Sequence, residues 1–291
     1  MTAPPPAEKK GTGYFLCSAP AGPSGQKGAC PLFLPIPDHL VVLTFDDGCK
    51  SDVDFVAPLL VEYGFGATFF VNEASGWRGG DDRNYMTWQD VREVHQAGFE
   101  IGNHTRSHPN VSSLSRQAFL AELEFIERRC QEHGVPVPRS FCYPGYHFGR
   151  NAAEVLAEKG YSFARRGSSP EVPYNESGQR GLVYDPAEHH PLLVPATGVS
   201  GPDWCADDLA WGVDQARSGR IAVLNFHGVP DVEHPWVHTD PKAFLGYMDL
   251  LRDRGCTVIA MRDLVRYVAP AAGPLDPFGP IEGRRHWDLR G

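Results

Sequence analysis

Two neighbouring carboxylates stand where an apolar run gives way to a glycine. Asp46 and Asp47 follow the run 40–43, inside the segment TFDDG at 44–48. A run that is apolar at consecutive positions is typical of a strand buried on both faces, as in a parallel sheet. In α/β folds, chemistry collects at the carboxyl ends of such strands. We therefore interpret the pair as catalytic or metal-binding carboxylates, with a solvated Asx turn as the structural alternative.

Two histidines about sixty residues further on add metal-binding potential. His104 and His108 are spaced i and i+4, so both rings can meet one ion on a single turn. Two imidazoles and one carboxylate make a facial metal site with open positions. Pro109 disfavours a helical conformation at His108, which predicts a tight turn after a strand at 99–102 rather than a solvated helix with a chance pair. That turn would lie at the same edge of the sheet as the two aspartates.

A third histidine also follows an apolar run. His227 ends the run 221–226 and precedes a glycine. This is where barrel enzymes keep acids and bases, although a buried structural histidine is the alternative.

Further candidates are backbone amides and polar side chains after other strands. Gly145 and Tyr146 follow a predicted strand at 140–143, in a Pro-Gly turn whose amides could face an oxyanion. Asp203 and Trp204 open a helix in a stretch with little periodicity, where a simple helix N-cap is the alternative.

These residues need a scaffold in which strands and helices alternate. From residue 39 on, apolar runs predict strands at 39–45, 66–71, 99–102, 140–143, 161–165, 191–194, 221–226 and 256–260. Amphipathic segments predict helices at 53–63, 87–97, 115–133, 150–159, 206–218, 241–254 and 261–268. Such alternation predicts an α/β fold with a parallel sheet, and about eight strands suffice to close a barrel. We expect one catalytic domain at 39–268, between an irregular arm at 1–38 and an irregular tail at 269–291, both rich in Pro and Gly.

The net charge and the composition limit the classes of binding partner that we expect. The formal net charge is −9, which gives no electrostatic reason to bind nucleic acid or anionic lipid. The apolar runs are strand-sized, so we expect no membrane-spanning helix, and residues 1–16 lack the pattern of a signal peptide. The seven cysteines form no zinc-knuckle pairs, and we interpret most of them as buried thiols. Cys17 and Cys30 could pair in an exported protein, so the compartment stays open between the cytoplasm, the default, and an exported mature form.

Together these residues resemble the polysaccharide deacetylases of the chitin deacetylase, or NodB-homology, type over about residues 39–268. The segment 44–48 looks like the first motif of that family, 104–108 the second, 141–145 the third, Asp203-Trp204 the fourth and 224–227 the fifth. The resemblance implies a distorted (β/α) barrel and a metal-dependent amide hydrolysis that releases acetate.

The resemblance also implies roles for individual residues. By carry-over, Asp47, His104 and His108 hold one divalent metal ion, Asp46 is the general base and His227 protonates the leaving amine. Zinc is the default for two histidines and one carboxylate, and cobalt, nickel, manganese or iron could replace it. The oxyanion would be shared with a backbone amide near Gly145 or Tyr146, and Asp203 and Trp204 would contact the substrate.

One position departs from the family pattern. Many members carry an arginine, paired with the base, where this chain has Cys142. Arg139 is three residues away and therefore on the opposite strand face. Arg165 or Arg166, whichever points inward from the next strand, is the better candidate.

The sequence thus predicts a metal-dependent hydrolase that removes N-acetyl groups from an amino sugar or glycan, of chitooligosaccharide or peptidoglycan type. A hydrolase of linear or cyclic amides and ureides on the same fold is the runner-up, because a fold does not fix a substrate. A non-catalytic glycan-binding relative is disfavoured because Asp46 and His227 accompany the three ligands. We expect a carbohydrate substrate, with neither nucleic acid nor membrane as partner. The glycan and the oligomeric state are not specified.

Overall fold

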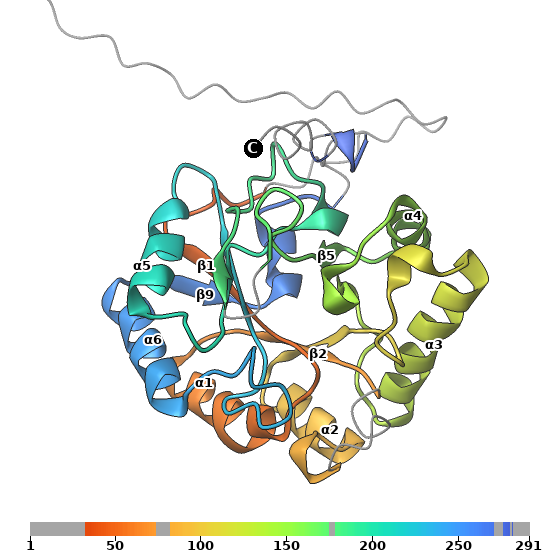
Figure 1. Cartoon of the computed structure of the whole chain (residues 1–291), viewed down its shortest axis with the longest axis horizontal. Coiled ribbons are helices and arrows are strands. Elements are labelled where there is room, and N and C mark those ends of the chain that lie inside the picture. Colours follow the sequence, from red (N-terminus) through yellow and green to blue (C-terminus); the bar gives the residue numbers. More distant parts are fainter. Residues whose placement is uncertain (1–32, 74–81, 175–177, 271–275, 280, 282–291) are drawn as a thin grey trace, which may run out of the picture. The chain divides into compact units, whose positions relative to one another are not determined.

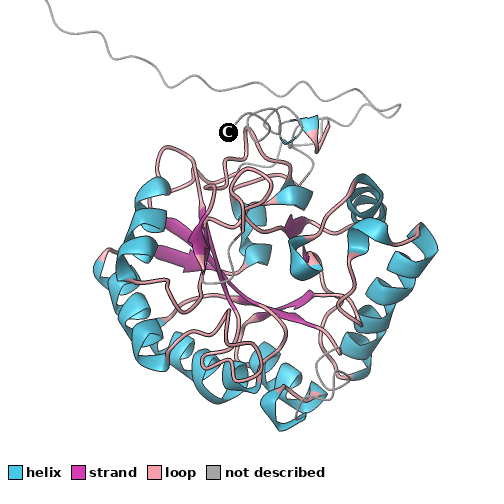
Figure 2. Ribbon diagram, viewed as in Figure 1, coloured by secondary structure: helices cyan, strands magenta, loops and turns pink. Residues whose placement is uncertain are grey.

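The computed structural model describes residues 33–73, 82–174, 178–270, 276–279 and 281, and these contain one curled sheet (Figures 1 and 2). The sheet order is β5-β4-β3-β2-β1-β8-β7-β6, and β9 pairs with the first half of β1. Every pair is parallel except β6 with β7. The strands are β1 (Leu40–Phe45), β2 (Thr68–Val71), β3 (Glu100–Asn103), β4 (Ser140–Cys142), β5 (Phe163–Arg165), β6 (Gln179–Arg180), β7 (Gly198–Val199), β8 (Ala222–Phe226) and β9 (Thr257–Ile259).

The segment 194–199 joins the two sides of the curled sheet. Val194 forms a parallel bridge with Arg165 at the end of β5, and its N–H donates to Ala164 O at 2.9 Å. A few residues later, Thr197 N donates to Val223 O in β8 at 2.7 Å. The segment therefore pairs with β5 at one end and with β8 at the other, and the predicted distorted (β/α) barrel is confirmed.

Helices surround the sheet (Figure 1). They are α1 (Ala57–Tyr63), α2 (Trp88–Gln96), α3 (Arg116–Glu132), α4 (Arg150–Glu158), α5 (Ala206–Gln215) and α6 (Pro241–Asp253). Shorter helical turns are η1 (Asp52–Val56), η3 (Asp82–Asn84), η4 (Val111–Ser113), η5 (Pro144–Tyr146), η6 (Pro191–Leu193) and η7 (Met261–Arg266). No helix in the described part of the chain is both long and apolar enough to cross a bilayer.

Both faces of the strands are covered, which explains their continuous apolar runs. All six residues of β1 are buried. Val41 and Leu43 belong to the core cluster beneath the helices, whereas Leu40 and Val42 belong to the cluster inside the barrel. Since side chains alternate along a strand, every strand contributes one set of residues to the interior and the other to the helix layer.

The barrel interior is arranged in levels. At the amino ends of the strands, the buried Glu100 accepts hydrogen bonds from Thr68 Oγ1 and Ser140 Oγ, each at 2.6 Å, and from Arg262 N at 2.7 Å. Above this polar level, apolar side chains such as Phe70 and Val223 fill the interior. The next inward positions lie at the carboxyl ends of the strands, where the candidate site was expected.

One predicted strand is wrong, and the helix predicted at 261–268 is a 3₁₀ helix at Met261–Arg266. The strand predicted at 191–194 is wrong, because Pro191–Leu193 form a 3₁₀ turn and only Val194 pairs with a strand. Pro191 lacks the N–H that a ladder needs and favours the start of a helical turn. The antiparallel strand β6 was not predicted, since two residues carry no periodic signal.

The domain limits stay a prediction. Most of the predicted arm and the pair Cys17 and Cys30 lie outside the described residues, and residues 33–38 contain neither helix nor strand. In the tail, the buried Phe278 lies 6.0 Å from Phe148 between ring centroids, so this part packs on the core.

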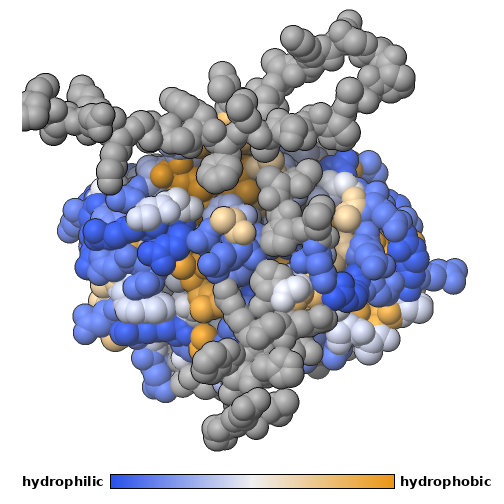
Figure 3. Space-filling model, turned by 90° about the horizontal axis from the view of Figure 1, so that it is seen from above, coloured by the Kyte–Doolittle hydropathy of each residue, from blue (hydrophilic) through white to orange (hydrophobic). Residues whose placement is uncertain are grey.

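The outer surface of the described domain is mostly polar. On the face drawn in Figure 3, most of the visible described residues are hydrophilic, with an apolar area near the top centre and a thinner apolar tract below it. The large apolar side chains that are exposed are Phe33, Leu34, Val61, Val232, Trp236, Leu245 and Val265. One of them, Trp236, lies at the candidate site.

Candidate active site

The alternation of side chains along the strands explains which residues form the floor of the site. In β1, β2, β3, β4, β5 and β8, the inward set of side chains ends in a residue with a polar or ionisable group at the carboxyl end of the strand. The residues at these positions are Asp46, Asn72, His104, Cys142, Arg165 and His227. Because the strands are parallel, all six side chains gather at one end of the barrel.

The three predicted ligands meet beside this floor. Asp47 Oδ1 lies 3.5 Å from His104 Nε2 and 3.6 Å from His108 Nε2, and the three residues form a group that could hold a metal ion. Asp47 and His108 have positive φ angles of 72° and 51°. Such angles are costly for residues other than glycine, and they cluster at functional sites. Burial raises the pKa of Asp47, but the histidines around it, above all His108 and His104, outweigh burial and hold the pKa below its usual value.

Hydrogen bonds fix the histidine segment as a turn, as predicted. The Nδ1 of His104 lies 2.8 Å from Cys142 O. A carbonyl can only accept, so Nδ1 carries the hydrogen and Nε2 remains for a metal. Ser107 donates to Glu122 of α3 from its N–H and from its Oγ, at 2.7 and 2.8 Å. Asn72 Nδ2 donates to Asp47 Oδ1 at 2.9 Å, which orients the carboxylate.

Asp46 is the second carboxylate, and its partners differ from those of Asp47. Arg165 Nη2 lies 2.6 and 2.5 Å from its two oxygens, and His227 Nε2 lies 3.9 Å from Oδ2. Burial raises the pKa of Asp46, but Arg165 and the histidines His104 and His227 outweigh it and hold the pKa below the usual value. Asp46 is therefore an ionised carboxylate at neutral pH, in reach of a proton carried by a reacting molecule.

The arrangement of β4 and β5 explains why Arg165, and not Arg166, reaches Asp46. Cys142 and Arg165 are register partners on adjacent strands, so both side chains point into the barrel. Cys142 Sγ lies 3.6 Å from Asp46 Oδ2, and burial raises the pKa of its thiol well above the usual range. Arg166 points the other way and pairs with Glu171 at 2.7 Å. Arg139 donates to Lys159 O on the exterior.

The turn after β4 leaves one amide available. Tyr146 N already donates to Tyr143 O at 3.0 Å, whereas the N–H of Gly145 has no acceptor among the described residues. Tyr146 keeps a positive φ of 60°, and its Oη accepts a hydrogen bond from Asn225 Nδ2 at 2.8 Å. Gly145 thus offers the free donor, and Tyr146 offers a ring and a hydroxyl.

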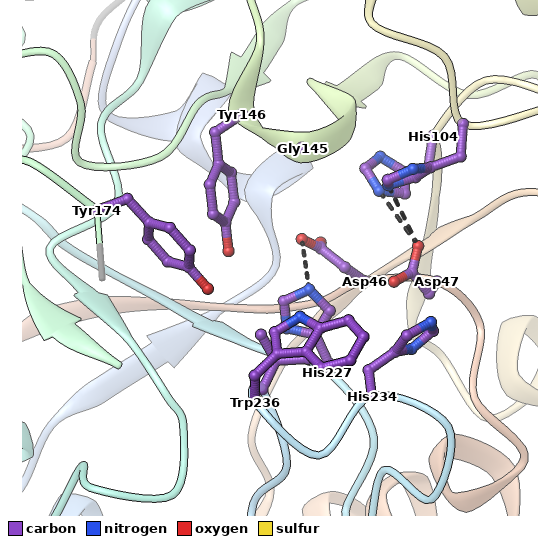
Figure 4. A pocket seen from close by; sticks show the side chains of 11 residues that line it. Asp46, Asp47, His104, Gly145, Tyr146, Tyr174, His227, His234 and Trp236 are labelled. Carbon is purple, nitrogen blue, oxygen red and sulfur yellow. Dashed lines mark ion pairs between the residues drawn. The ribbon is translucent and has the colours of Figure 1, made fainter. Parts of the chain in front are cut away.

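These residues line one pocket of about 620 Å³, measured to its open mouth (Figure 4). Of the predicted residues, the pocket is lined by Asp46, Asp47, His104, His108, Gly145, Tyr146 and His227. Tyr174, His234, Trp236 and Val237 complete the lining.

Asp203 and Trp204 are not brought to this pocket. Asp203 is exposed, and Trp204 is buried in the helix layer, 5.7 Å from the ring of Tyr247 and 6.0 Å from that of Phe226. Trp204 also fills the space beside Gly198, where an added Cβ would lie only 2.6 Å from its ring. The structure therefore does not bring Asp203 and Trp204 together with the other predicted site residues, their contact with substrate stays a prediction, and Trp204 packs in the core.

Residues of the site that the sequence did not single out come from two sources. Asn72 lies at the inward position just past β2, so the alternation that marks Asp46 could have found it. Tyr174 and His234 come from irregular segments far from any strand end, for which the sequence carries no periodic signal.

Comparison with known proteins agrees with this geometry. Residues 35–164 match the family model described as polysaccharide deacetylase. The polysaccharide deacetylase homologue YxkH of Bacillus subtilis (strain 168) is 30% identical over 125 residues, which is 43% of this chain and 43% of YxkH. The resemblance seen in the motifs is thus confirmed over residues 35–164, which match this family model, and the chain spans less than half the length of YxkH.

Solved structures support the same fold. The chitin deacetylase of the fungal pathogen Colletotrichum lindemuthianum aligns with a TM-score of 0.55 and 18% identity over 83% of this chain and 93% of that chain. The Bc1960 peptidoglycan N-acetylglucosamine deacetylase aligns with a TM-score of 0.55 and 17% identity over 80% of this chain and 90% of that chain. At these identities the likeness concerns the fold alone.

Proposed function

We propose that this protein is a metal-dependent hydrolase that removes N-acetyl groups from an amino sugar or glycan and releases acetate. The observation that carries the proposal is the convergence of three potential ligands, Asp47, His104 and His108, with a separate ionised carboxylate, Asp46, in one pocket. The match of residues 35–164 to the family model described as polysaccharide deacetylase supports the same reaction.

The donor set fits a small divalent ion. Ligand atoms about 2.1 Å from a tetrahedral zinc ion lie about 3.4 Å apart. The separations of Asp47 Oδ1 from the two histidine nitrogens are 3.5 and 3.6 Å, close to that value. The Nδ1–H of His104 is held by Cys142 O, which is the usual outer support of a ligating imidazole. Two imidazoles and one carboxylate favour zinc, and cobalt, nickel, manganese or iron could take its place.

Asp46 supplies the general base. A divalent ion held by the three ligands would polarise the acetyl carbonyl and acidify the attacking water. Asp46 would accept the proton of that water as it adds to the carbonyl carbon. Arg165 keeps the carboxylate ionised and directed toward the pocket, because Nη2 contacts both of its oxygens.

His227 and Gly145 would serve the later steps. His227 lines the pocket with its Nε2 3.9 Å from Asp46 Oδ2. It would protonate the amine nitrogen as the C–N bond breaks. The free N–H of Gly145 could donate to the oxygen that becomes negatively charged in the tetrahedral intermediate. Tyr146 is excluded as the backbone donor, because its own N–H is already engaged.

The walls of the pocket suit a sugar. Tyr146 and Tyr174 lie on one side and Trp236 on another (Figure 4). Aromatic rings pack on the apolar faces of sugar rings while their hydroxyl or N–H groups serve as hydrogen-bond partners. Among the described residues that line the pocket there is no Lys or Arg, which favours a neutral acetylated sugar over a strongly acidic ligand.

Acetate release tests the reaction and its substrate class. The protein should be incubated with acetylated chitooligosaccharides, peptidoglycan fragments and simple linear or cyclic ureides. We expect acetate from an acetylated sugar. Turnover of ureides alone would favour the runner-up hydrolase, and no turnover of any compound by metal-loaded protein would favour a non-catalytic glycan-binding protein.

Metal analysis tests the ligand assignment. Purified wild-type protein should contain about one divalent ion per chain, and a variant with both His104→Ala and His108→Ala should lose most of it. His95→Ala, on the exterior helix α2, is the control and should keep the metal. Equal metal content in all three proteins would contradict the site.

A further inference from the structure

The loop between β8 and α6 carries a second histidine–carboxylate pair. Asp231 is buried, and its Oδ1 accepts hydrogen bonds from the N–H of Glu233 at 3.1 Å and of His234 at 2.8 Å. Its Oδ2 lies 3.4 Å from Nδ1 of His234. The backbone bonds fix the carboxylate, and the carboxylate lies beside the imidazole as a potential ion-pair partner.

This arrangement favours one position for the ring hydrogen of His234. Asp231 is an ionised acceptor at neutral pH, because its bond to His234 and the nearby His227 hold its pKa below the usual value against the effect of burial. A carboxylate can only accept, so its position 3.4 Å from Nδ1 favours the tautomer of His234 that carries the ring hydrogen on Nδ1. The other nitrogen, Nε2, is then able to accept a hydrogen bond, or to donate one when the ring is protonated.

The loop is anchored at several points. Val229 N donates to Ser51 Oγ at 2.9 Å, near the start of the loop. Ser200 Oγ lies 2.7 Å from Thr239 Oγ1, near its end. Between them, Asn84 Nδ2 donates to the Glu233 side chain at 2.5 Å. A side chain on such a loop is pre-organised, so that little conformational entropy is lost when it binds a ligand.

His234 lies in the wall of the candidate site rather than in its metal group. It lines the same pocket as Asp47, on the side away from Tyr146 and Tyr174 (Figure 4). Among the described residues, the groups whose atoms are close enough to share an ion do not include His234. Its ring meets Trp236 edge-on, with centroids 5.3 Å apart and an interplanar angle of 64°. Trp236 is 48% exposed, so part of its surface is open to a ligand.

We propose that His234, oriented by Asp231, binds the substrate. It hydrogen-bonds a hydroxyl oxygen of the sugar ring that bears the acetamide, while Trp236 covers an apolar face of the same sugar. This assignment rests on the proposed function and adds a specificity residue to it. A binding role suits His234 better than proton transfer, because His227 lies at Asp46 Oδ2, beside the proposed base. Asp231 acts through His234 and is a positioning residue.

Steady-state kinetics test this role. His234→Gln should raise KM for triacetylchitotriose about tenfold and change kcat less than about threefold, as expected when a hydrogen bond common to ground state and transition state is lost. Metal content should stay at the wild-type level. Asp231→Asn, which weakens the hold on Nδ1, should shift KM in the same direction.

His238→Gln is the matched control. His238 belongs to the same loop and its Nδ1 contacts Asp231 O at 3.2 Å, but it does not line the pocket. Its kinetics should match those of the wild type. An unchanged KM in His234→Gln, or a loss confined to kcat, would overturn the binding role.

Calorimetry separates this proposal from the proposed reaction. Binding of triacetylchitotriose can be measured in an Asp46→Asn background, in which hydrolysis should be slow. Adding His234→Gln should weaken binding about tenfold, and adding His238→Gln should not. This difference can appear even if no protein of the series releases acetate, in which case only the reaction fails. Equal affinity with and without His234→Gln, or no binding by the Asp46→Asn protein, would overturn the role of His234.

Discussion

Asp46 and Asp47 are neighbours in the chain and yet have different surroundings. Asp46 continues the inward set of β1 and meets Arg165, whereas Asp47 adopts a positive φ and turns to Asn72 and the histidine turn. Two adjacent carboxylates can therefore perform two tasks, one as metal ligand and the other as base. The strained backbone at Asp47 is the cost of this division.

The division of roles predicts different effects of two matched substitutions. Asp46→Asn should keep the metal and lose about a hundredfold or more in kcat, because a positioned general base typically contributes that much. Asp47→Asn should lose much of the metal, since a neutral amide is a weaker ligand than a carboxylate. Metal analysis and acetate release on both proteins check this. If Asp46→Asn loses the metal and Asp47→Asn keeps it, the two roles are reversed.

Arg165 contacts Asp46 from the strand next to Cys142, the position at which the family pattern has an arginine. The neighbouring Arg166 provides a control. Removing the guanidinium removes the main influence that lowers the pKa of Asp46, so that pKa should rise. A base with a higher pKa is protonated at a higher pH. Arg165→Met should therefore reduce kcat and shift the acidic limb of the pH–rate profile upward, with metal content intact.

Arg166→Met is the control for this prediction. Arg166 is buried and pairs with Glu171, away from the site, so its loss should lower the melting temperature because a buried ion pair is broken, but leave the acidic limb in place. An unmoved acidic limb in Arg165→Met would mean that Asp46 works without an arginine.

At the scale of elements, the carboxyl ends of the strands could be predicted from the sequence. The apolar runs at 40–45 and 221–226 are continuous because both faces are covered, and the residue after each run projects into the barrel mouth. This logic led to Asp46, His104 and His227. The same logic limited the candidates for an arginine that pairs with Asp46 to Arg165 and Arg166. The register of Cys142 with Arg165 shows that Arg165 is the one that points into the barrel.

Other features depended on contacts that periodicity does not encode. In the sequence, Asp203-Trp204 resembles a site motif, but in the structure the Trp204 ring packs against Gly198 in the helix layer. The pair Asp231 and His234 forms within an irregular loop, where only the local turn brings the carboxylate to the imidazole. The segment Pro191–Leu193 forms a 3₁₀ turn, but its sequence resembles that of a buried strand because it is a short apolar run.

Helix α3 contributes to the site through one side chain. Glu122 holds Ser107 in the middle of the histidine turn by two hydrogen bonds. Glu122→Ala should therefore leave the fold intact and weaken metal affinity about tenfold, the lower end of the effect usual for outer-shell partners of metal ligands. Glu124→Ala is the control, because Glu124 is exposed on the same helix and its carboxylate lies 3.5 Å from Lys159 Nζ, away from the histidine turn. Metal titration of both variants should separate them, and equal affinities would show that the turn needs no support from α3.

For the molecule as a whole, one buried carboxyl works against stability. Asp52 begins η1, is completely buried, and neither of its side-chain oxygens has a hydrogen-bond partner among the described residues. Glu100 is equally buried but accepts three hydrogen bonds at the other end of the barrel. Burial raises the pKa of both groups, and for Asp52 the nearby carboxylates of Asp231 and Asp46 raise it further.

The sign of the resulting pH dependence follows from the direction of the shift. In the unfolded chain Asp52 loses its proton near pH ~3.9, whereas the folded protein keeps it to a much higher pH. Between these two values the folded state binds more protons than the unfolded state, so this group makes stability fall as pH rises, by at most about 1.4 kcal/mol per pH unit.

Asp52→Asn should remove that dependence. Its unfolding free energy, relative to the wild type and measured by urea titration under the same metal supply, should grow from pH 5 to pH 8, because only the wild type has a charge to bury. Glu100→Gln should instead be destabilising throughout this range, since an amide replaces one acceptor oxygen by a donor that faces the hydroxyls of Thr68 or Ser140. A constant difference between Asp52→Asn and the wild type across these pH values would mean that Asp52 keeps an ordinary pKa in the folded protein, which would require a partner such as an ordered water at its oxygens.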